Sequence, residues 1–553
     1  MKRFIPVLLI LLISFSACMK KEKAEVQRPK LVIGLVIDQM RWDYLYRYNQ
    51  RYGHDGFKRL MGHGFNCENT MINYLPAFTG PGHTCIYTGS VPSIHGIAAN
   101  DWIENLTNKP MYCVQDTTVH GVGSTDKSVG QMSPRNLLTT TITDELRLAT
   151  NLRSRVYGIS IKDRGAILPA GHLANGAYWY DENTGNFISS SYYSNASPQW
   201  LQDFNKRRVA DSLLKQNWTL LYPANTYIQS TVDATNYEKG FKGEKAPVFP
   251  HTFDSMEKKD AYTALKTIPA GNTIALDLAR ECIAGEKLGQ TDNTDFLCVS
   301  LSATDYAGHQ FGPNAIELED MYLRLDNEIA MFLNYLDKTV GKGNYLFFLT
   351  ADHGAAHNSS FLTDLDIPAG NMSPNIQDNL NAYLDKIYGK TPLVANAMNY
   401  QLYLNEDLIA SAKLDREKIK TSIKDWFKRK PEVAYIVDFE DINKTPLPEP
   451  IRTMVVNGYY RLRSGDMQVI LNPGWYDYSK ANGSISTGTT HGTWNPYDAH
   501  IPLLWYGWHV KKGKTFNTIG MTDIAPTLAA MLHIQMPNGC IGKVIPGLMQ
   551  RDH

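Results

Sequence analysis

Three aspartates and three histidines have the residue types and the spacing of metal ligands. A carboxylate and an imidazole stand four residues apart in one segment and side by side in another, and a further histidine lies in a Gly-rich segment. Mixed Asp and His ligands suit zinc. Six of them predict two sites of three ligands each, and two metals about 4 Å apart can clamp the attacking and leaving oxygens of an in-line displacement. The residues are Asp38, Asp305, His309, Asp352, His353 and His491.

Each of these groups also has an ordinary interpretation. Asp305 and His309 are compatible with a surface ion pair, and Asp352-His353 with a turn. Asp38 is compatible with a helix cap. His500, just before an expected strand, competes with His491 for the role of the third imidazole. The metal hypothesis therefore depends on the joint occurrence of the six residues near the ends of apolar segments.

Thr79 is expected at the start of a helix. Pro81 suits the first helical turn and Gly89 the C-terminal end, so the pattern predicts a helix between them that begins at Thr79. Free N–H groups and the helix dipole at that end favour an anion. The alternative is that Thr79 is an N-cap with no further role.

Four apolar segments that end in charged residues have the character of buried parallel strands. The helical pattern of Ile316–Leu336 separates two of them, and such alternation predicts an α/β fold with a mostly parallel central sheet flanked by helices. Because ligands bind beyond the carboxyl ends of strands in such sheets, the charged ends predict one polar site. The segments are Leu31–Asp38, Arg155–Lys162 with Arg164 after it, Asp295–Asp305 and Tyr345–His353.

Two regions interrupt this alternation and are predicted to be insertions that form a cap over the sheet edge. Residues 171–270 are rich in Tyr, Asn, Ser and Gly, and residues 359–490 mix short helices and strands. Pro502–Gly507 is expected as a late strand and Thr522–Leu532 as the final helix. Since no stretch has the composition of an interdomain linker, residues 30–553 are predicted to form one catalytic domain.

The N-terminus has the pattern of an export signal. A basic start is followed by the apolar run 4–16, which is too short to span a membrane. Small residues before Cys18 and a polar stretch after it resemble a bacterial lipoprotein signal. Residues 1–17 are therefore predicted as a signal peptide and 18–29 as a tether with a lipid anchor at Cys18, and simple cleavage nearby is the alternative. The expected location is the periplasm or, through the lipid, the outer membrane.

The composition suits a large globular protein and gives no support to several other classes. The 553 residues are 43% hydrophobic and 20% charged, which suits a large globular protein. The formal net charge is zero, so charge gives no support to binding of nucleic acid or of a membrane surface. Six cysteines follow Cys18 without a C-x-x-C motif, so a cysteine zinc knuckle is not expected, although export would permit disulfides.

Together these segments resemble the alkaline phosphatase superfamily, in particular its PafA-type phosphate monoesterases, which are close to the nucleotide pyrophosphatase/phosphodiesterase branch. The resemblance runs from about Lys30 to the C-terminus. It rests on Asp38 after its strand, Thr79-Gly-Pro-Gly-His83, Ser93-Ile-His-Gly-Ile97 with Asn100, Ala170-Gly-His-Leu-Ala-Asn-Gly-Ala-Tyr-Trp-Tyr-Asp181, Thr304-Asp-Tyr-Ala-Gly-His309, Thr350-Ala-Asp-His-Gly354, His491-Gly-Thr493 and Asp523-Ile-Ala-Pro-Thr-Leu528.

The resemblance implies an alkaline-phosphatase-like fold that holds two zinc ions and hydrolyses small phosphate monoesters. It favours His491 over His500. It also implies that Thr79 lies between the metals, as a ligand and as the nucleophile, and forms a covalent phosphothreonine that water then hydrolyses. The implied ligands are Asp305, His309 and His491 for one zinc and Asp38, Asp352 and His353 for the other.

Lys162 and Arg164 are predicted to bind the phosphate group, and Asn100 to donate a further hydrogen bond. A monoester presents three non-bridging oxygens and about two negative charges, whereas a diester presents one fewer of each. Two cations at one strand end suit the monoester, since Arg can grip two oxygens and Lys acts as a point charge. The alternative is that residues 162–164 form a solvated turn.

The main alternative function is a phosphodiesterase or nucleotide pyrophosphatase with the same two-metal site. A sulfatase is disfavoured because no Cys/Ser-x-Pro-x-Arg motif stands at the nucleophile, and a serine hydrolase because no G-x-S-x-G motif occurs. From a different class, a non-catalytic phosphate-binding lipoprotein would be indicated by loss of Thr79 or of a ligand, and none is lost.

Overall fold

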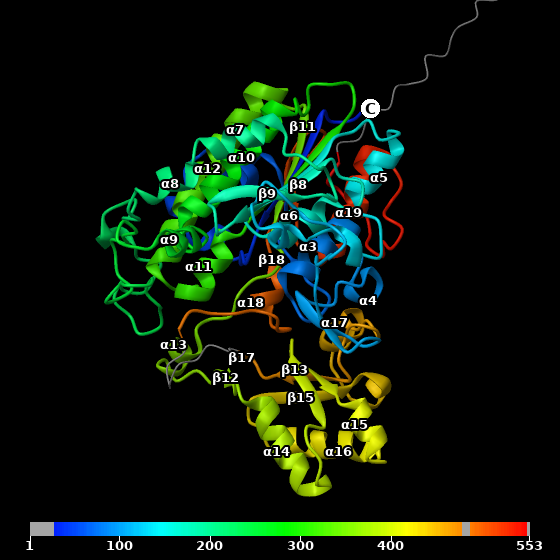
Figure 1. Ribbon diagram of the computed structural model, residues 1–553. Helices are drawn as coiled ribbons and strands as arrows, with labels where there is room; N and C mark the ends of the chain where they lie inside the picture. The colour runs from blue at the N-terminus through cyan, green and yellow to red at the C-terminus, as the bar shows by residue number, and fades with distance from the viewer. Residues whose placement is uncertain (1–26, 478–486, 550–553) are drawn as a thin grey trace, which may run out of the picture.

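A ten-stranded, mostly parallel sheet lies at the centre of the computed structural model, which describes residues 27–477 and 487–549 (Figure 1). The strand order is β20-β2-β19-β11-β1-β10-β7-β8-β9-β6. The five strands from β11 to β8 are parallel, and β19 and β9 are antiparallel to their neighbours β11 and β8. The strands are β1 (Leu31–Ile37), β2 (Phe65–Cys67), β6 (Gly121–Val122), β7 (Val156–Ser160), β8 (Gly176–Asp181), β9 (Asn186–Ser190), β10 (Asp295–Leu301), β11 (Tyr345–Thr350), β19 (Leu503–Gly507) and β20 (Gly513–Thr515).

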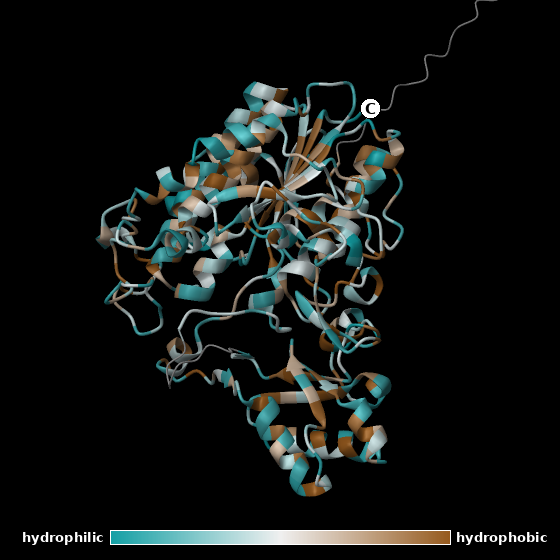
Figure 2. Ribbon diagram, in the orientation of Figure 1, coloured by the Kyte–Doolittle hydropathy of each residue, from teal (hydrophilic) through white to brown (hydrophobic). Residues whose placement is uncertain are grey.

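The predicted α/β class is confirmed, and the four apolar segments form the central strands. Every residue of β1, β7, β10 and β11 is buried, as continuous apolar runs require when helices cover both faces. Figure 2 shows hydrophobic residues gathered in these strands and hydrophilic residues on the helices around them. The late strand is β19, and the helix expected at Ile316–Leu336 has those bounds in the structure.

Helices cover the sheet on two sides (Figure 1). On one side lie α3 (Thr79–Thr88), α5 (Ile142–Ala149), α6 (Asp163–Ala170) and α19 (Ile524–Leu532). On the other lie α7 (Gln199–Lys206), α10 (Pro269–Gly285) and α12 (Ile316–Leu336). Other helices of this lobe are α1 (Tyr44–Arg47), α2 (Phe57–His63), α4 (Pro92–His95), α8 (Val209–Leu214), α9 (Lys258–Leu265), α11 (Ala303–Phe311) and α18 (Pro496–Ala499).

The first expected insertion, residues 171–270, begins later than predicted. Its first part forms β8 and β9, which belong to the central sheet. Aromatic residues of these strands are buried, so their Tyr- and Asn-rich composition does not mark a surface segment. Small sheets join other parts of the chain: β18 (His500–Ile501), β3 (Thr70–Met71) and β21 (Ile519–Gly520); β4 (Asp101–Glu104) and β5 (Lys109–Tyr112); β12 (Gly370–Met372) and β17 (Trp475–Asp477).

The second expected insertion contains a small lobe with its own sheet and core. Its sheet has the order β13-β14-β16-β15, and its helices pack a separate cluster of buried apolar residues against it. The elements of this lobe are α14 (Ile376–Tyr388), β13 (Val394–Met398), β14 (Gln401–Leu404), α15 (Glu406–Ser411), α16 (Arg416–Phe427), β15 (Val433–Asp438) and β16 (Met467–Leu471). The insertion also contains α13 (Ser359–Thr363) and α17 (Ile451–Gly458), and the buried residues of α17 belong to the main core. In Figure 1 this lobe lies below the main sheet.

The predicted signal peptide, Cys18 and most of the tether lie outside the described residues. The chain enters the folded body at Arg28, whose Nε donates a hydrogen bond to the Leu532 carbonyl oxygen over 2.6 Å. No helix of the described part of the chain is long and apolar enough to cross a membrane. The six described cysteines are free thiols.

Candidate active site

Four neighbouring strands bring the charged segments to one edge of the sheet. β11, β1, β10 and β7 are adjacent and parallel, so their carboxyl ends lie together. Asp38 follows β1 directly, and Asp352 and His353 follow β11 by one residue. Just beyond β10, α11 carries Asp305 and His309 one turn apart, which places both side chains on one helix face.

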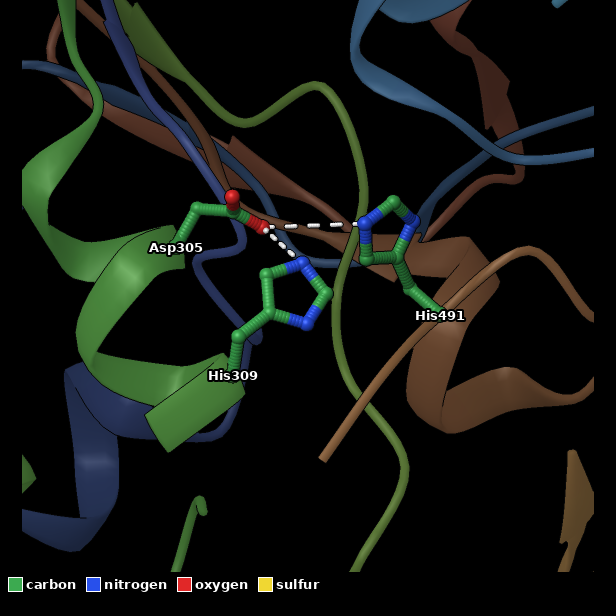
Figure 3. Close-up of side chains that lie close together, drawn as sticks. All are labelled: Asp305, His309 and His491. Carbon is green, nitrogen blue, oxygen red and sulfur yellow. Dashed lines mark ion pairs between the residues drawn. The ribbon is translucent and has the colours of Figure 1, made fainter. Parts of the chain in front are cut away.

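Asp305 is the centre of the first ligand group (Figure 3). Its Oδ1 atom lies 3.2 Å from His309 Nε2 and 3.6 Å from His491 Nε2. Asp305 and His491 are buried, while His309 is partly exposed. His491 comes from the segment before α18, 180 residues after the end of α11, and Figure 3 shows its ring directed at Asp305.

The second ligand group is fully buried and adjoins the first. His353 Nε2 lies 3.5 Å from Asp38 Oδ1 and 3.6 Å from Asp352 Oδ2. The rings of His353 and His491 stack with centroids 3.5 Å apart, so the two groups are neighbours. Within each group the candidate ligand atoms lie within 4.8 Å of one another.

Backbone carbonyls orient all three histidines in the same way. The Nδ1 atoms of His309, His353 and His491 lie 2.8, 3.0 and 2.8 Å from the carbonyl oxygens of Thr489, Gly354 and Ala77. A carbonyl oxygen only accepts, so Nδ1 carries a proton in each ring, and Nε2 is the atom left to bind a metal. This is the usual arrangement of metal-binding imidazoles.

The donor set and its unpaired atoms fit zinc. Asp38 Oδ1 and His353 Nε2 are buried and make no hydrogen bond to any described residue, a cost that a bound cation would remove. Burial, and then the charge of Asp352, raise the pKa of Asp38 to about 7. Burial also opposes ionisation of Asp352, but His353 and His83 outweigh it and lower the pKa of that carboxyl. Two groups of three N and O ligands leave a fourth tetrahedral position open in each.

Lys162 links the two ligand groups. Its Nζ lies 2.8 Å from Asp38 Oδ2 and 2.5 Å from Asp305 Oδ2, and its side chain is 2% exposed. Burial alone would lower the pKa of Lys162, but Asp305 and Asp38 outweigh it and raise it. Likewise, burial opposes the charge on Asp305, and His309 and Lys162 hold its pKa well below its usual value. The ammonium group is therefore charged and lies between the two centres.

Thr79 is the first residue of α3 and not its N-cap. The cap is Phe78, in an extended conformation and with no side-chain capping bond. The Gly80 N–H donates to Asn100 Oδ1 over 2.8 Å, and Pro81 has no N–H, so fewer free donors face an anion than the helix-start pattern predicted. The end of α3 at Gly89, with φ of 63°, agrees with the expected C-terminal stop.

The neighbours of Thr79 place it beside both ligand groups. His491 is bonded to the carbonyl of Ala77, two residues before Thr79. The backbone of Gly82 packs against Asp352 so closely that a Cβ there would lie 2.5 Å from the Asp352 carbonyl oxygen. His83, one turn after Thr79, brings its Nδ1 to 3.2 Å from Asp352 Oδ2. The first turn of α3 thus bridges the two centres.

Arg164 lies in α6, because the strand before it ends at Ser160 and Lys162 caps the helix. The two cations therefore do not share a strand face. Arg164 donates to the Tyr112 hydroxyl over 3.1 Å, and Tyr112 in turn donates to Asp163. The Nε of Arg164 is buried and makes no hydrogen bond to a described residue. Both cations line a cavity of about 330 Å³. Because Lys162 is buried and caps α6, residues 162–164 do not form a solvated turn.

Only the oxygen of the Asn100 side-chain amide is hydrogen-bonded within the described part of the chain. Its Oδ1 accepts from Gly80, and its Nδ2 makes no hydrogen bond to the residues that the structure describes. His500 lies apart from the ligands: its ring stacks on Trp42, and its Nε2 lies 2.9 Å from the Glu68 carbonyl oxygen. Of the two competing histidines, the structure therefore brings only His491 to the ligand groups.

Some residues that hold the site in place were not predicted from the sequence. Gln39 donates from Nε2 to Asp305 Oδ1 over 2.7 Å and from its backbone to Asp352 Oδ1 over 3.2 Å. Its φ of 64° turns the chain after β1 and has no signal in the sequence. His83 was visible as part of the Gly-Pro-Gly-His segment, while Tyr112 carried no signal.

Comparisons with known proteins agree with this architecture. The family model described as type I phosphodiesterase/nucleotide pyrophosphatase matches residues 32–494. A relative from Synechococcus elongatus, named alkaline phosphatase PhoV, is 50% identical over 551 residues and 98% of each chain. A relative from Myroides odoratus, named calcium-transporting ATPase, is 51% identical over 532 residues and 96% of each chain. The crystal structure of wild-type alkaline phosphatase PafA is 47% identical, with a TM-score of 0.91 over 95% of this chain and 100% of that one.

The sheet and the paired ligand groups are those of the alkaline phosphatase superfamily, as the sequence resemblance implied. Within it, the chain belongs to the type I phosphodiesterase/nucleotide pyrophosphatase family.

Proposed function

We propose that this chain is a zinc-dependent alkaline phosphatase, which hydrolyses phosphate monoesters of small molecules through a covalent phosphothreonine at Thr79. The observation that carries the proposal is the pair of adjoining ligand groups beside the first turn of α3. The relatives named alkaline phosphatase, at 50% and 47% identity over nearly the whole chain, support the phosphatase activity. Hydrolysis of ATP, which the name of the Myroides relative includes, also transfers a terminal phosphoryl group.

The six ligands are assigned as two sets. Zinc, when bound, supplies positive charge that activates a hydroxyl nucleophile and stabilises phosphoryl oxygens. One ion would be held by Asp305, His309 and His491 and the other by Asp38, Asp352 and His353, with Thr79 between them.

The chain's own residues position the phosphoryl group. The Thr79 hydroxyl attacks phosphorus, and the alcohol leaves in line with it, so the phosphoryl group is transferred to the threonine oxygen; water then releases phosphate. The Asn100 Nδ2 donates to a phosphoryl oxygen, since its carbonyl oxygen is already bonded to Gly80. Lys162 and Arg164 supply the charge, and the unpaired buried Nε of Arg164 gives a donor for the substrate.

Selectivity for monoesters follows from the number of donors. A monoester offers a third non-bridging oxygen, which the two cations can bind, whereas a diester places a second organic group there. The family description includes diesterases, so the alternative is a phosphodiesterase or nucleotide pyrophosphatase with the same two-metal site.

Rates on an aryl phosphate, an aryl phosphodiester and an aryl sulfate, each with and without chelator, test the proposal. We expect the monoester to be the best substrate and chelator to abolish its hydrolysis. A diester rate above the monoester rate would establish the alternative, and activity that survives removal of the metals would reject the two-zinc mechanism.

We also propose export, with residues 1–17 as the signal peptide, 18–29 as the tether and a lipid on Cys18. The pattern of the N-terminal sequence supports it, and Arg28, near the end of the proposed tether, donates to the Leu532 carbonyl oxygen at the end of α19. The small lobe and the irregular segment between α8 and α9 are proposed as caps around the site.

A further inference from the structure

A hairpin turn of the small lobe reaches the candidate active site. Met398 pairs with Gln401, so the turn between β13 and β14 consists of Asn399 and Tyr400 alone. Their φ angles are 57° and 60°, as in the tight turns that favour Asn and Gly. Asn tolerates this left-handed conformation, whereas a bulky residue such as Tyr rarely adopts it. A tyrosine at a position that suits glycine points to a role for its side chain.

Tyr400 contacts the segments on both sides of the nucleophile. Its ring is buried and stacks on Phe78, the residue before Thr79, with centroids 6.4 Å apart. Its hydroxyl donates to the His491 carbonyl oxygen over 3.2 Å and accepts from the Asp477 N–H over 3.1 Å. Gly492 makes this approach possible, because a Cβ there would lie 2.6 Å from Phe78 and 2.9 Å from Tyr400.

Asn399 contacts a third segment of the site. Its Nδ2 donates to the Asp101 carbonyl oxygen over 2.6 Å, and Asp101 follows Asn100, the proposed phosphate-binding amide. The turn is also bonded to the sheet of the small lobe, since the Tyr400 carbonyl oxygen accepts from the Val469 N–H of β16 over 2.8 Å. One two-residue turn therefore joins the core of the small lobe to three segments of the site.

We propose that Asn399 and Tyr400 are positioning residues, which set the place of His491 relative to Thr79 and the place of Asn100 for phosphate. This inference rests on the proposed function of the site. Neither side chain bonds to a candidate metal ligand atom, so both act through the backbone. Because His491 is also bonded to the carbonyl of Ala77, a shift of His491 would be passed to the start of α3.

The test uses two variants that keep the backbone of the turn. Tyr400→Phe keeps the ring stacked on Phe78 and removes the hydroxyl, and Asn399→Gly permits the same φ and removes the amide. Tyr403→Phe is the matched control, because Tyr403 lies in β14, the strand that follows the turn, and its hydroxyl also donates to a backbone carbonyl oxygen, that of Arg463, over 3.1 Å but away from the ligands. For each variant we would measure melting temperature, kcat and KM on a monoester, and the rate of zinc release to a chromogenic chelator.

We expect the two variants to change different quantities. Tyr400→Phe should release zinc about 10- to 100-fold faster and lower kcat, as loss of a group that orients a ligand does, at a melting temperature equal to that of Tyr403→Phe. Asn399→Gly should raise KM and leave zinc release unchanged. The inference is overturned if Tyr400→Phe matches Tyr403→Phe in zinc release and kcat, or if Asn399→Gly leaves KM unchanged. A wild-type protein without zinc or without monoesterase activity would instead reject the proposed function.

Discussion

Arg164 offers the sharpest test of the proposed substrate selectivity. Replacing it with alanine removes a half-buried guanidinium whose buried Nε is unpaired and whose Nη1 donates to Tyr112. Unlike Lys162, which bonds to Asp38 and Asp305, Arg164 bonds to no candidate ligand. Its removal therefore reports on the phosphoryl oxygens without disturbing the metal centres.

The expected effect of Arg164→Ala follows from the loss of one preorganised charged donor. Such a donor stabilises the transition state by about 3–4 kcal/mol, which corresponds to a fall of about 10²–10³-fold in kcat/KM for a monoester. A diester has one fewer non-bridging oxygen for Arg164 to bind, so its kcat/KM should fall by less than about tenfold. Tyr112→Phe, which keeps the guanidinium but removes its partner, should give a smaller loss in the same direction.

The assay compares kcat/KM for an aryl monoester and an aryl diester on the same protein preparations. Arg135→Ala is the control, since it removes an arginine that is 62% exposed and pairs with Asp116. The reasoning is refuted if Arg164→Ala lowers both rates equally or changes neither.

Three further predictions concern the nucleophile, the metals and the anchor. Thr79→Ala should keep its fold and its metal while losing nearly all turnover, and Thr79→Ser should keep a substantial part; near wild-type rates for Thr79→Ala would exclude it as the nucleophile. Asp352→Asn should lose one metal and most activity, because a neutral amide binds zinc poorly, and an unchanged metal content by elemental analysis would remove Asp352 from the ligands. Cys18→Ala should move the protein from the membrane to the soluble fraction, and unchanged fractionation would argue for ordinary signal cleavage or another anchor.

The parts of the fold that depend only on which residues are buried could be predicted from the sequence. β1, β10 and β11 are continuous apolar runs, and the charged residues after them lie at one sheet edge because parallel strands place their carboxyl ends together. α12 was predicted at its observed bounds because its apolar residues recur at helical spacing.

Other features depend on contacts between distant segments. β8 and β9 carry Tyr, Trp and Asn that are also common in loops, and only their pairing with β7 makes them strands of the sheet. The helix that begins at Thr79 was predicted from the sequence, whereas the identity of its N-cap, Phe78, was not, because Phe78 makes no side-chain capping bond. The turn at Asn399–Tyr400 contacts His491 and Asp101, which are 91 and 298 residues away in the sequence. No local sequence pattern predicts contacts between segments so far apart.

Metal content tests most directly whether the two ligand groups hold zinc. Elemental analysis of the purified protein should find two zinc ions per chain, one for each group, and a chelator that removes them should abolish monoester hydrolysis. A protein that contains no zinc and keeps its full activity in chelator would contradict the account.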